Sequence, residues 1–265
     1  MKKLLLFFAP MLLAHIEWEI IVPTYNNEQW CIQNIESVVQ QTYPHWHATI
    51  IIDCATDATE SLLRAYVQEN ALEDKITLKV NKKNRGALAN IYFAAMACPP
   101  HKVIGLLDGD DWFKDAYVLE KVTHVYETED VWMTYGQFEL WPEDRIGHCR
   151  PYSNAVIQQN AFRAVPGVLP SHFRTFYAWL FQRIDKKDLI YKGKFFPVAW
   201  DMALMYPVIE MSGKHHKCIT DVLYVYNIAN PLNDFKERAL LQAQLDRFIR
   251  AKKRYSPLKD KPHEL

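Results

Sequence analysis

Three aspartates close an apolar segment near the middle of the 265-residue sequence. Residues 103–107 have the length and composition of a buried strand, and Asp108, Asp110 and Asp111 follow them directly. Burying carboxylates is costly unless they are paired or bind a cation. Several acids delivered to one edge of a sheet therefore indicate a divalent cation with oxygen ligands, Mg²⁺ or Mn²⁺, which would neutralise phosphates. The alternative is a solvated turn, in which Asp and Gly are common for backbone reasons.

The overall composition limits the class of protein. Basic and acidic residues number 31 each, so the net charge gives no global attraction for nucleic acid or an anionic membrane. The basic cluster formed by Lys82, Lys83 and Arg85 is local. The length and a hydrophobic content of 49% suffice for one large α/β domain. The five cysteines are odd in number and never form a CxxC pair, which argues against a disulfide framework and a structural zinc site.

The first 18 residues form an apolar lead. Lys2 and Lys3 precede the apolar run 4–14, an order typical of a secretory signal, although the run is too short to span a bilayer. A lead that touches a membrane, or that simply precedes the first strand, fits the same residues. We therefore expect a cytoplasmic or membrane-peripheral protein, with a secretory route as the alternative.

Strands and helices alternate in the first half of the chain. The apolar patterns predict strands at 19–23, 48–53, 76–81 and 103–108, and helices at 27–41, 56–70, 86–98 and 115–127. Such alternation with short turns is typical of βαβ units, so we predict an α/β fold with a Rossmann-like, mostly parallel sheet flanked by helices. The second half is less regular. Its patterns predict helices at 173–184 and 201–207, a strand at 222–226 and a charged amphipathic helix at 234–255.

Polar residues gather where the predicted parallel strands end. Residues 23–27, 53–57 and 108–111 each follow a strand, and residues 84–86 lie in the turn that opens the third helix. In open parallel sheets, ligands bind beyond the carboxyl ends of the strands, so these four clusters are expected to share one pocket. The sequence has neither GxGxxG after the first strand nor GxxxxGK[ST]. Their absence disfavours a backbone cradle for a diphosphate and favours a metal ion as its counter-charge.

The same clusters resemble the opening of family 2 glycosyltransferases of the GT-A fold. The resemblance rests, in order along the chain, on Ile20-Ile21-Val22-Pro23-Thr24-Tyr25-Asn26, on residues 37–44, on residues 53–59, on Asn84-Arg85-Gly86 and on Leu107-Asp108-Gly109-Asp110-Asp111. It implies a nucleotide-sugar pocket lined by Pro23, Thr24 and Tyr25, with Asn84, Arg85 and Gly86 under the nucleotide.

The resemblance also implies roles for the acids. Asp53 would accept a hydrogen bond from the base, usually uracil. Asp110 and Asp111 would meet the ribose and the metal, with Asp108 supporting them. The usual paired acids and Gly-Ser of the second motif are replaced here by Ile52-Asp53 and Cys54-Ala55, which leaves the identity of the nucleobase open.

Parts of the second half resemble a subset of this family found beside procollagen-galactosyltransferase-like and giant-virus enzymes. The segments concerned are residues 170–176, 201–205, 210–213, 224–227 and 230–234. By this resemblance Asp201 is the catalytic base; from its position before an apolar helix alone, an N-cap is the more common role of such an aspartate. His172 and Arg174 would bind phosphate or the donor sugar, or would lie at the start of a surface helix.

These resemblances imply a metal-dependent, inverting transfer of a sugar from a nucleotide-diphosphate sugar, with UDP as the expected nucleotide. Residues 19–128 would bind the donor, and residues 129–265, an elaboration that ends in the charged helix, would bind the acceptor. The cofactor would be Mn²⁺ or Mg²⁺, and the acceptor a hydroxyl of a saccharide, lipid or protein, with no nucleic acid as partner. A metal-dependent nucleotidyltransferase and a catalytically inactive sugar-binding protein on the same fold are the alternatives.

Overall fold

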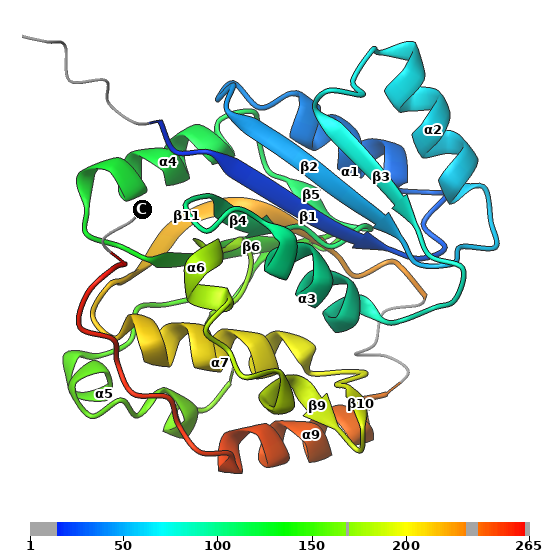
Figure 1. The fold of residues 1–265 in the computed structure, drawn as a ribbon. Coiled ribbons are helices and arrows are strands. Elements are labelled where there is room, and N and C mark those ends of the chain that lie inside the picture. Colours follow the sequence, from blue (N-terminus) through cyan, green and yellow to red (C-terminus); the bar gives the residue numbers. More distant parts are fainter. Residues whose placement is uncertain (1–14, 168–169, 232–237, 263–265) are drawn as a thin grey trace, which may run out of the picture.

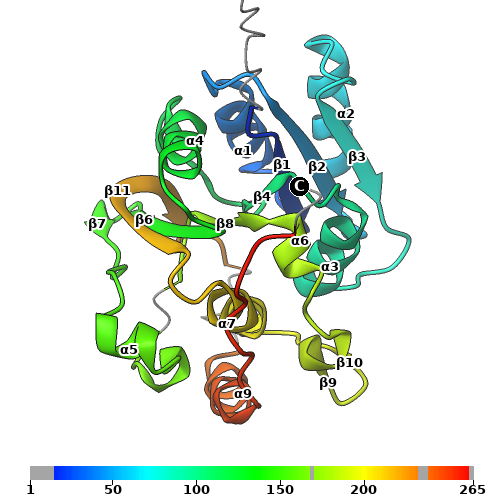
Figure 2. The ribbon, with the colours of Figure 1, turned by 60° about the vertical axis from the view of Figure 1, so that its left-hand side comes forward.

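The computed structural model describes residues 15–167, 170–231 and 238–262 (Figure 1). Its centre is a nine-stranded sheet of order β3-β2-β1-β4-β8-β6-β11-β5, with β7 paired to β6. Helices cover both faces of this sheet (Figures 1 and 2). Residues 1–14 of the predicted apolar lead lie outside the described residues. No helix among the described residues is both long and apolar enough to cross a bilayer.

Four parallel strands form the first half of the sheet. They are β1 (Trp18–Thr24), β2 (Trp46–Ile52), β3 (Ile76–Val80) and β4 (Val103–Leu106), and β1 lies between β2 and β4. The helices of this half are α1 (Cys31–Val39), α2 (Thr59–Glu69), α3 (Ala87–Ala97) and α4 (Val118–Thr128). The predicted α/β alternation is confirmed, because each of these elements lies within its predicted range or extends it by one or two residues.

Both faces of the parallel strands are buried. Ile20 and Val22 of β1 pack into the apolar cluster that includes α1, α2 and α4. Ile21, between them, packs into the cluster that includes α3. Successive strand residues point to opposite faces, so a strand covered on both sides is apolar at successive positions and not only at every second one. This explains why residues 20–23 of β1 form a continuous apolar run in place of alternation.

The sheet becomes mixed in the second half. Strand β8 (Arg174–Tyr177) runs antiparallel between β4 and β6 (Met133–Trp141), and β6 runs parallel to β11 (His216–Asn227). The short strand β5 (Trp112–Phe113) closes the far edge, antiparallel to β11. One sheet therefore extends through both of the halves predicted from the sequence.

The predicted helix at 173–184 is wrong for its first part. Residues 174–177 form β8, and only α6 (Ala178–Phe181) is helical. Strand β8 is buried between two other strands, and the Thr175 hydroxyl is within hydrogen-bond distance of the hydroxyls of Tyr126 (2.9 Å) and Thr134 (2.7 Å). Residues 174–176 are all buried, the polar Arg174 and Thr175 included, so the segment has no period of buried and exposed residues that separates helix from strand, which explains the error.

The remaining elements surround the second half of the sheet. They are β7 (Arg145–Ile146), α5 (Asn154–Gln158), the 3-10 helices Phe162–Ala164 and Lys186–Leu189, the hairpin β9 (Ile190–Tyr191) and β10 (Lys194–Phe195), α7 (Trp200–Ser212) and α9 (Ala239–Ala251). The predicted helix at 201–207 is confirmed and continues past Pro207. The predicted strand at 222–226 is the second part of β11, and α9 lies within the predicted 234–255, of which residues 234–237 are outside the described residues.

Candidate active site

The strand-end clusters meet at one edge of the sheet. The backbone N–H of Asp53, after β2, donates to the carbonyl of Thr24 at 2.8 Å. The N–H of Gly109, after β4, donates to the carbonyl of Pro23 at 3.1 Å. The ends of β1, β2 and β4 are therefore joined by backbone hydrogen bonds, as the parallel register requires. The acids after β2 and β4 lie at the same edge, as predicted.

Gly109 allows the aspartate turn to pass close over the end of β1. A Cβ atom at this position would lie 2.5 Å from both Cβ and Oγ1 of Thr24. Contacts this short do not occur between ordinary side chains, so any other residue would displace the turn. The Asp-Gly-Asp order therefore places Asp108 and Asp110 on either side of a contact that only glycine permits.

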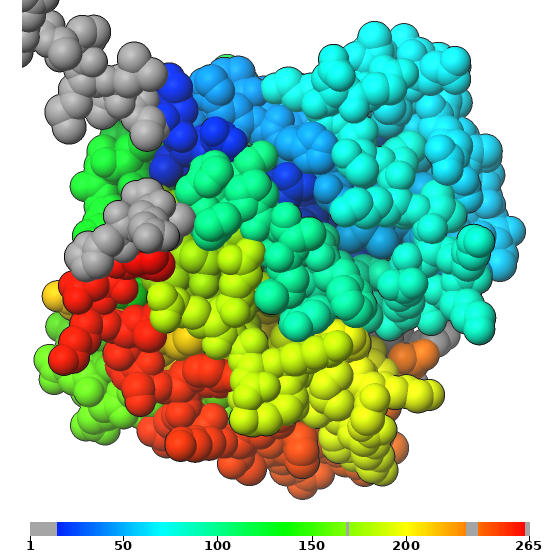
Figure 3. Space-filling model, in the orientation of Figure 1, coloured from blue at the N-terminus to red at the C-terminus, as the bar shows by residue number. Residues whose placement is uncertain are grey.

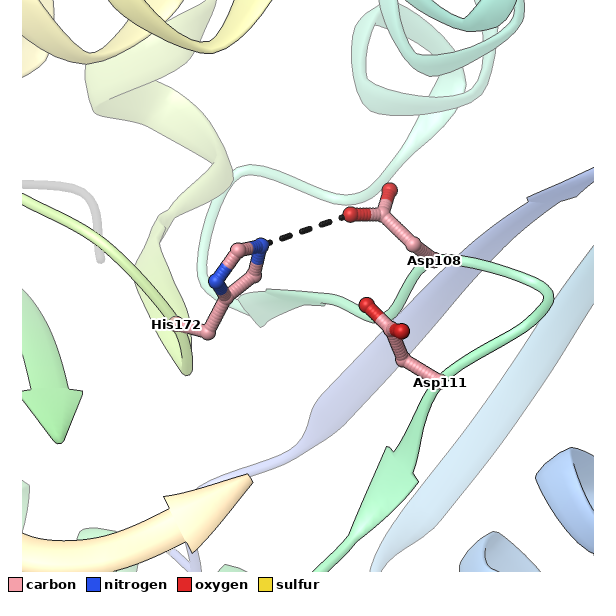
Figure 4. Close-up of side chains that lie close together, drawn as sticks. All are labelled: Asp108, Asp111 and His172. Carbon is pink, nitrogen blue, oxygen red and sulfur yellow. Dashed lines mark ion pairs between the residues drawn. The ribbon is translucent and has the colours of Figure 1, made fainter. Parts of the chain in front are cut away.

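Asp108 and Asp111 converge with His172, which precedes β8 (Figure 4). One ligand atom from each of the three lies within 4.8 Å of the others, and Nε2 of His172 is 3.5 Å from Oδ2 of Asp108. Two carboxylates and an imidazole suit Mn²⁺ as well as other first-row divalent ions. The sequence predicted Asp110 and Asp111 as the metal pair, whereas the structure groups Asp111 with Asp108 and His172.

Asp111 is fully buried, and its charge is poorly compensated. Its carboxylate accepts hydrogen bonds from the hydroxyl of Tyr224 and from the backbone N–H of Asn227, both at 2.7 Å. Burial, and next the negative charges of Asp110 and Asp108, raise the pKa of Asp111 well above its ordinary value. A divalent cation bound here would compensate this charge, so the residues fit the ion that the sequence predicts.

His172 is held in a form that can bind a metal. Its ring stacks on Tyr224 and Tyr226, with centroids 4.5 and 5.1 Å away. Burial, together with the charge of Arg174, lowers the pKa of His172 to about 4, so the imidazole is neutral near pH 7. Burial alone would raise the pKa of Asp108, but the hydrogen bond with His172 and the positive charge of Arg174 hold it below its ordinary value. A neutral imidazole beside a carboxylate is a usual ligand pair for a divalent ion.

Arg174 connects this acid cluster to Asp201. Nη2 of its buried guanidinium is 3.2 Å from Oδ2 of Asp201, and Nη1 is 4.0 Å from Oδ2 of Asp108. Nε and Nη1 make no hydrogen bond within the described part of the chain. Buried donors without a partner are costly, so this guanidinium has unused capacity for an anionic ligand. The guanidinium also lies 5.6 Å from the centre of the Trp200 ring.

Asp201 lies in the first turn of α7 and is not its N-cap. The cap position is Ala199, which has a left-handed backbone with φ of 52°. Oδ1 of Asp201 accepts from the N–H of Met202 at 2.9 Å, and the side chain is 26% exposed. The carboxylate is therefore fixed beside the acid cluster and still reachable from solvent, as a catalytic base must be. Its catalytic role stays a prediction.

Asp110 points to a different partner. Oδ2 of Asp110 accepts a hydrogen bond from the side-chain amide of Asn230 at 2.7 Å. The backbone carbonyl of Asp110 accepts one from the side-chain amide of Asn227 at 3.1 Å. The resemblance included the segments that hold Tyr224, Asn227 and Asn230 but assigned these residues no role. All three come from β11 and the chain after it, over 100 positions away, which no local pattern can pair with the aspartates.

The side of the site that is predicted to bind the nucleotide lies at the end of β3. The carboxylate of Asp53 accepts from the backbone N–H groups of Arg85 (2.9 Å) and Gly86 (2.8 Å) and from the Asn81 amide (2.7 Å). Asp53 therefore holds the turn of residues 84–86, and its contact with a base stays a prediction. Residues 80–85 line a depression of about 550 Å³. Among the other predicted residues, Tyr25 is 41% exposed and Thr24 is buried.

The fold and the acid-rich edge define a protein of the GT-A class. The profile described as glycosyl transferase family 2 matches residues 19–187, and the chain belongs to this family. This confirms the resemblance to family 2 glycosyltransferases drawn from the sequence. Among curated relatives, the putative colanic acid biosynthesis glycosyl transferase WcaA of Escherichia coli is 28% identical over 182 residues, which are 68% of this chain and 56% of that protein.

Two solved structures show the same fold at low sequence identity. The mannosyltransferase PcManGT from Pyrobaculum calidifontis, in complex with GDP-Man and Mn²⁺, has a TM-score of 0.60 and 19% identity, covering 91% of this chain and 66% of that one. Staphylococcus aureus TarS 1-349 in complex with UDP has a TM-score of 0.59 and 16% identity, covering 80% and 61%. The chain spans about half the length of the curated relatives it matches.

Proposed function

We propose that this chain transfers a sugar from a nucleotide-diphosphate sugar to a hydroxyl acceptor, with Mn²⁺ or Mg²⁺ and with inversion at the anomeric carbon. The observation that carries the proposal is the position of Arg174. Its guanidinium joins Asp108, in the candidate metal cluster, to Asp201, the candidate base. Donor activation and acceptor deprotonation would thus take place on the two sides of one buried cation.

Each residue of the site would have its own role in the proposed reaction. Asp108, Asp111 and His172 would hold the metal ion, which when bound supplies positive charge to the leaving diphosphate. The free N–H groups of Arg174 would donate to an anionic oxygen of the donor, adding charge-assisted hydrogen bonds. Asp201 would take the proton from the acceptor hydroxyl as that oxygen attacks the anomeric carbon from the face opposite the nucleotide.

We propose UDP as the nucleotide and a glycan hydroxyl as the acceptor. TarS binds UDP in its solved complex, whereas PcManGT binds GDP-Man, so proteins of this fold bind either nucleotide. The retained acid Asp53 is the residue that resembles the uracil-binding position. WcaA is described as a colanic acid biosynthesis enzyme, and TarS as a poly(ribitol-phosphate) β-N-acetylglucosaminyltransferase, and both names support a hydroxyl of a polymer as the acceptor.

The test is nucleotide release from a panel of UDP-sugars and GDP-Man, with Mn²⁺, Mg²⁺ or a chelator. We expect UDP to be released from one UDP-sugar, faster with an added glycan acceptor, and not with the chelator. Release of pyrophosphate from a nucleoside triphosphate and a sugar phosphate would show a nucleotidyltransferase. Binding of a nucleotide sugar without release, with every acceptor tried, would favour a sugar-binding protein on this fold.

A further inference from the structure

The outer face of α3 is apolar in a way that a water-exposed helix rarely is. The helix has no charged residue along its whole length, Ala87–Ala97. Leu88, Ile91 and Ala95 are buried in the core, but Phe93 and Met96 on the other side are 49% and 42% exposed. A helix at the surface normally carries charged side chains on its outer face. Large apolar side chains grouped at a surface mark an interaction site.

Lysine and arginine side chains surround these apolar residues. Lys82, Lys83 and Arg85 come from the loop before α3, and Lys186, Lys192 and Lys194 come from the 3-10 helix and the β9–β10 hairpin beside it; all six are exposed. Figure 3 shows α3, the hairpin and the end of the 80–86 loop on one side of the molecule. We call Phe93, Met96, Phe195 and these six cations the α3 face.

Direct contacts join the two parts of the α3 face. The ring of Phe93 lies 6.1 Å from that of Phe195 on β10. Nζ of Lys186 lies 5.6 Å from the centres of both rings, and the guanidinium of Arg85 lies 5.9 Å from that of Phe93. None of the six cations forms an ion pair with a carboxylate among the described residues. The positive charges of the face are therefore available to an outside partner.

We propose that the α3 face binds the surface of an anionic lipid bilayer. Phe93 and Met96 would enter the boundary between headgroups and acyl chains, and the lysines around them would contact anionic headgroups. The chain as a whole has no net charge, so only a local cluster of this kind can attract an anionic surface. A second copy of the chain is a poor occupant, because a symmetric contact would bring the same six cations together.

The face adjoins the nucleotide side of the candidate active site. Helix α3 begins directly after Gly86, whose N–H donates to Asp53 at 2.8 Å. Docking through α3 would therefore hold that edge of the sheet near the lipid surface. The proposal concerns attachment and stands apart from the transfer reaction, which the variants below leave intact because none changes a residue of the site.

The test is co-sedimentation of the full chain with vesicles of phosphatidylcholine alone or with added phosphatidylglycerol. We expect binding to the anionic vesicles that weakens as salt is raised. Lys186→Gln/Lys192→Gln/Lys194→Gln should lower the partition coefficient about tenfold or more, since each lysine at an anionic surface contributes several-fold. Phe93→Ser/Met96→Ser should lower it at every salt concentration, because it removes the inserted apolar groups.

Matched variants on other surfaces provide the controls. Lys214→Gln/Lys253→Gln/Lys259→Gln removes the same charge from exposed lysines, and Tyr117→Ser/Ile146→Ser removes exposed apolar groups of 54% and 52% exposure. All variants keep residues 1–14, so any contribution of that segment is common to them. The proposal is overturned if the α3 variants bind anionic vesicles as well as the control variants do, or if the unaltered chain does not bind these vesicles. Nucleotide release without vesicles tests the transfer reaction separately.

Discussion

The hydroxyl of Tyr224 bridges the two ends of the aspartate turn. It donates to Oδ2 of Asp111 at 2.7 Å and accepts from the backbone N–H of Asp108 at 3.0 Å. Strand β11 thus fixes the orientation of two candidate metal ligands from more than 110 positions away. The shape of the site depends on this contact as much as on the aspartates themselves.

Tyr224→Phe should loosen the metal cluster without changing its ligands. The variant leaves a buried N–H and a buried carboxylate oxygen unpaired, which should lower the free energy of unfolding by about 1–3 kcal/mol. Loss of a hydrogen bond that orients a ligand should weaken Mn²⁺ binding about 10- to 100-fold. Calorimetric titration with Mn²⁺ and thermal unfolding measure the two effects. Tyr117→Phe, on an exposed tyrosine, should change neither.

Asp201→Asn and Asp111→Ala should separate transfer from donor binding. Asp201→Asn removes the candidate base, so the transfer rate should fall about 10²- to 10⁴-fold while Mn²⁺-dependent UDP binding stays unchanged. Asp111→Ala removes a candidate ligand of the metal, so both the transfer and the Mn²⁺-dependent UDP binding should be lost. Calorimetry of UDP with and without Mn²⁺, beside an activity assay, gives the comparison. Unchanged UDP binding by Asp111→Ala would contradict the metal role.

Arg174→Lys tests whether the forked guanidinium is required. Lysine keeps the positive charge between Asp108 and Asp201 but cannot contact two groups in a fixed geometry. We expect a melting temperature near that of the unaltered chain and a transfer rate at least about tenfold lower, if Arg174 supplies one charge-assisted hydrogen bond to the donor. Arg174→Gln, which also removes the charge, should in addition destabilise the fold. Equal activity of Arg174→Lys and the unaltered chain would speak against a donor contact.

Gly109→Ala should displace the aspartate turn. Its Cβ would come within 2.5 Å of Thr24, so the turn must move or β1 must shift. Overpacking of this kind costs about 1–3 kcal/mol, and the same displacement should weaken Mn²⁺ binding. The measurement is urea unfolding together with Mn²⁺ titration. Gly193→Ala is the control, because a Cβ there meets nothing within 4 Å, although its positive φ allows a small loss of stability.

His216 should make the fold less stable in mild acid. The His216 ring lies near Phe162 and Tyr152, and burial, with a smaller effect of His215, lowers its pKa below the ordinary value. The unfolded chain then binds a proton near pH 6.5 that the folded chain does not, so stability falls as the pH drops through that value. Melting temperatures between pH 7.5 and 5.5 should decline less steeply for His216→Phe. An equal decline in both proteins would exclude this histidine as a cause.

The first half of the fold and its acids could be predicted from the sequence because both are local. Each βαβ unit appears as an apolar run, a turn and a periodic helix, and parallel strands necessarily bring their carboxyl ends to one edge. The positions of Asp53 and of the aspartates at 108–111, each directly after a strand, were therefore enough to place them together. Their individual contacts could not be predicted, since Asp53 and Asp110 each have partners that the sequence did not indicate.

The second half depended on pairing between distant segments. Residues 174–177 are a strand because β4 and β6 lie on either side of them, and the same mostly buried residues would also suit a buried helix. That strand brings His172 to Asp108 and Arg174 to Asp201, and β11 brings Tyr224 to Asp111. Side chains far apart in the sequence meet only when the chain is packed, so the acids could be recognised from local pattern, while the residues that complete their site came from the assembled sheet.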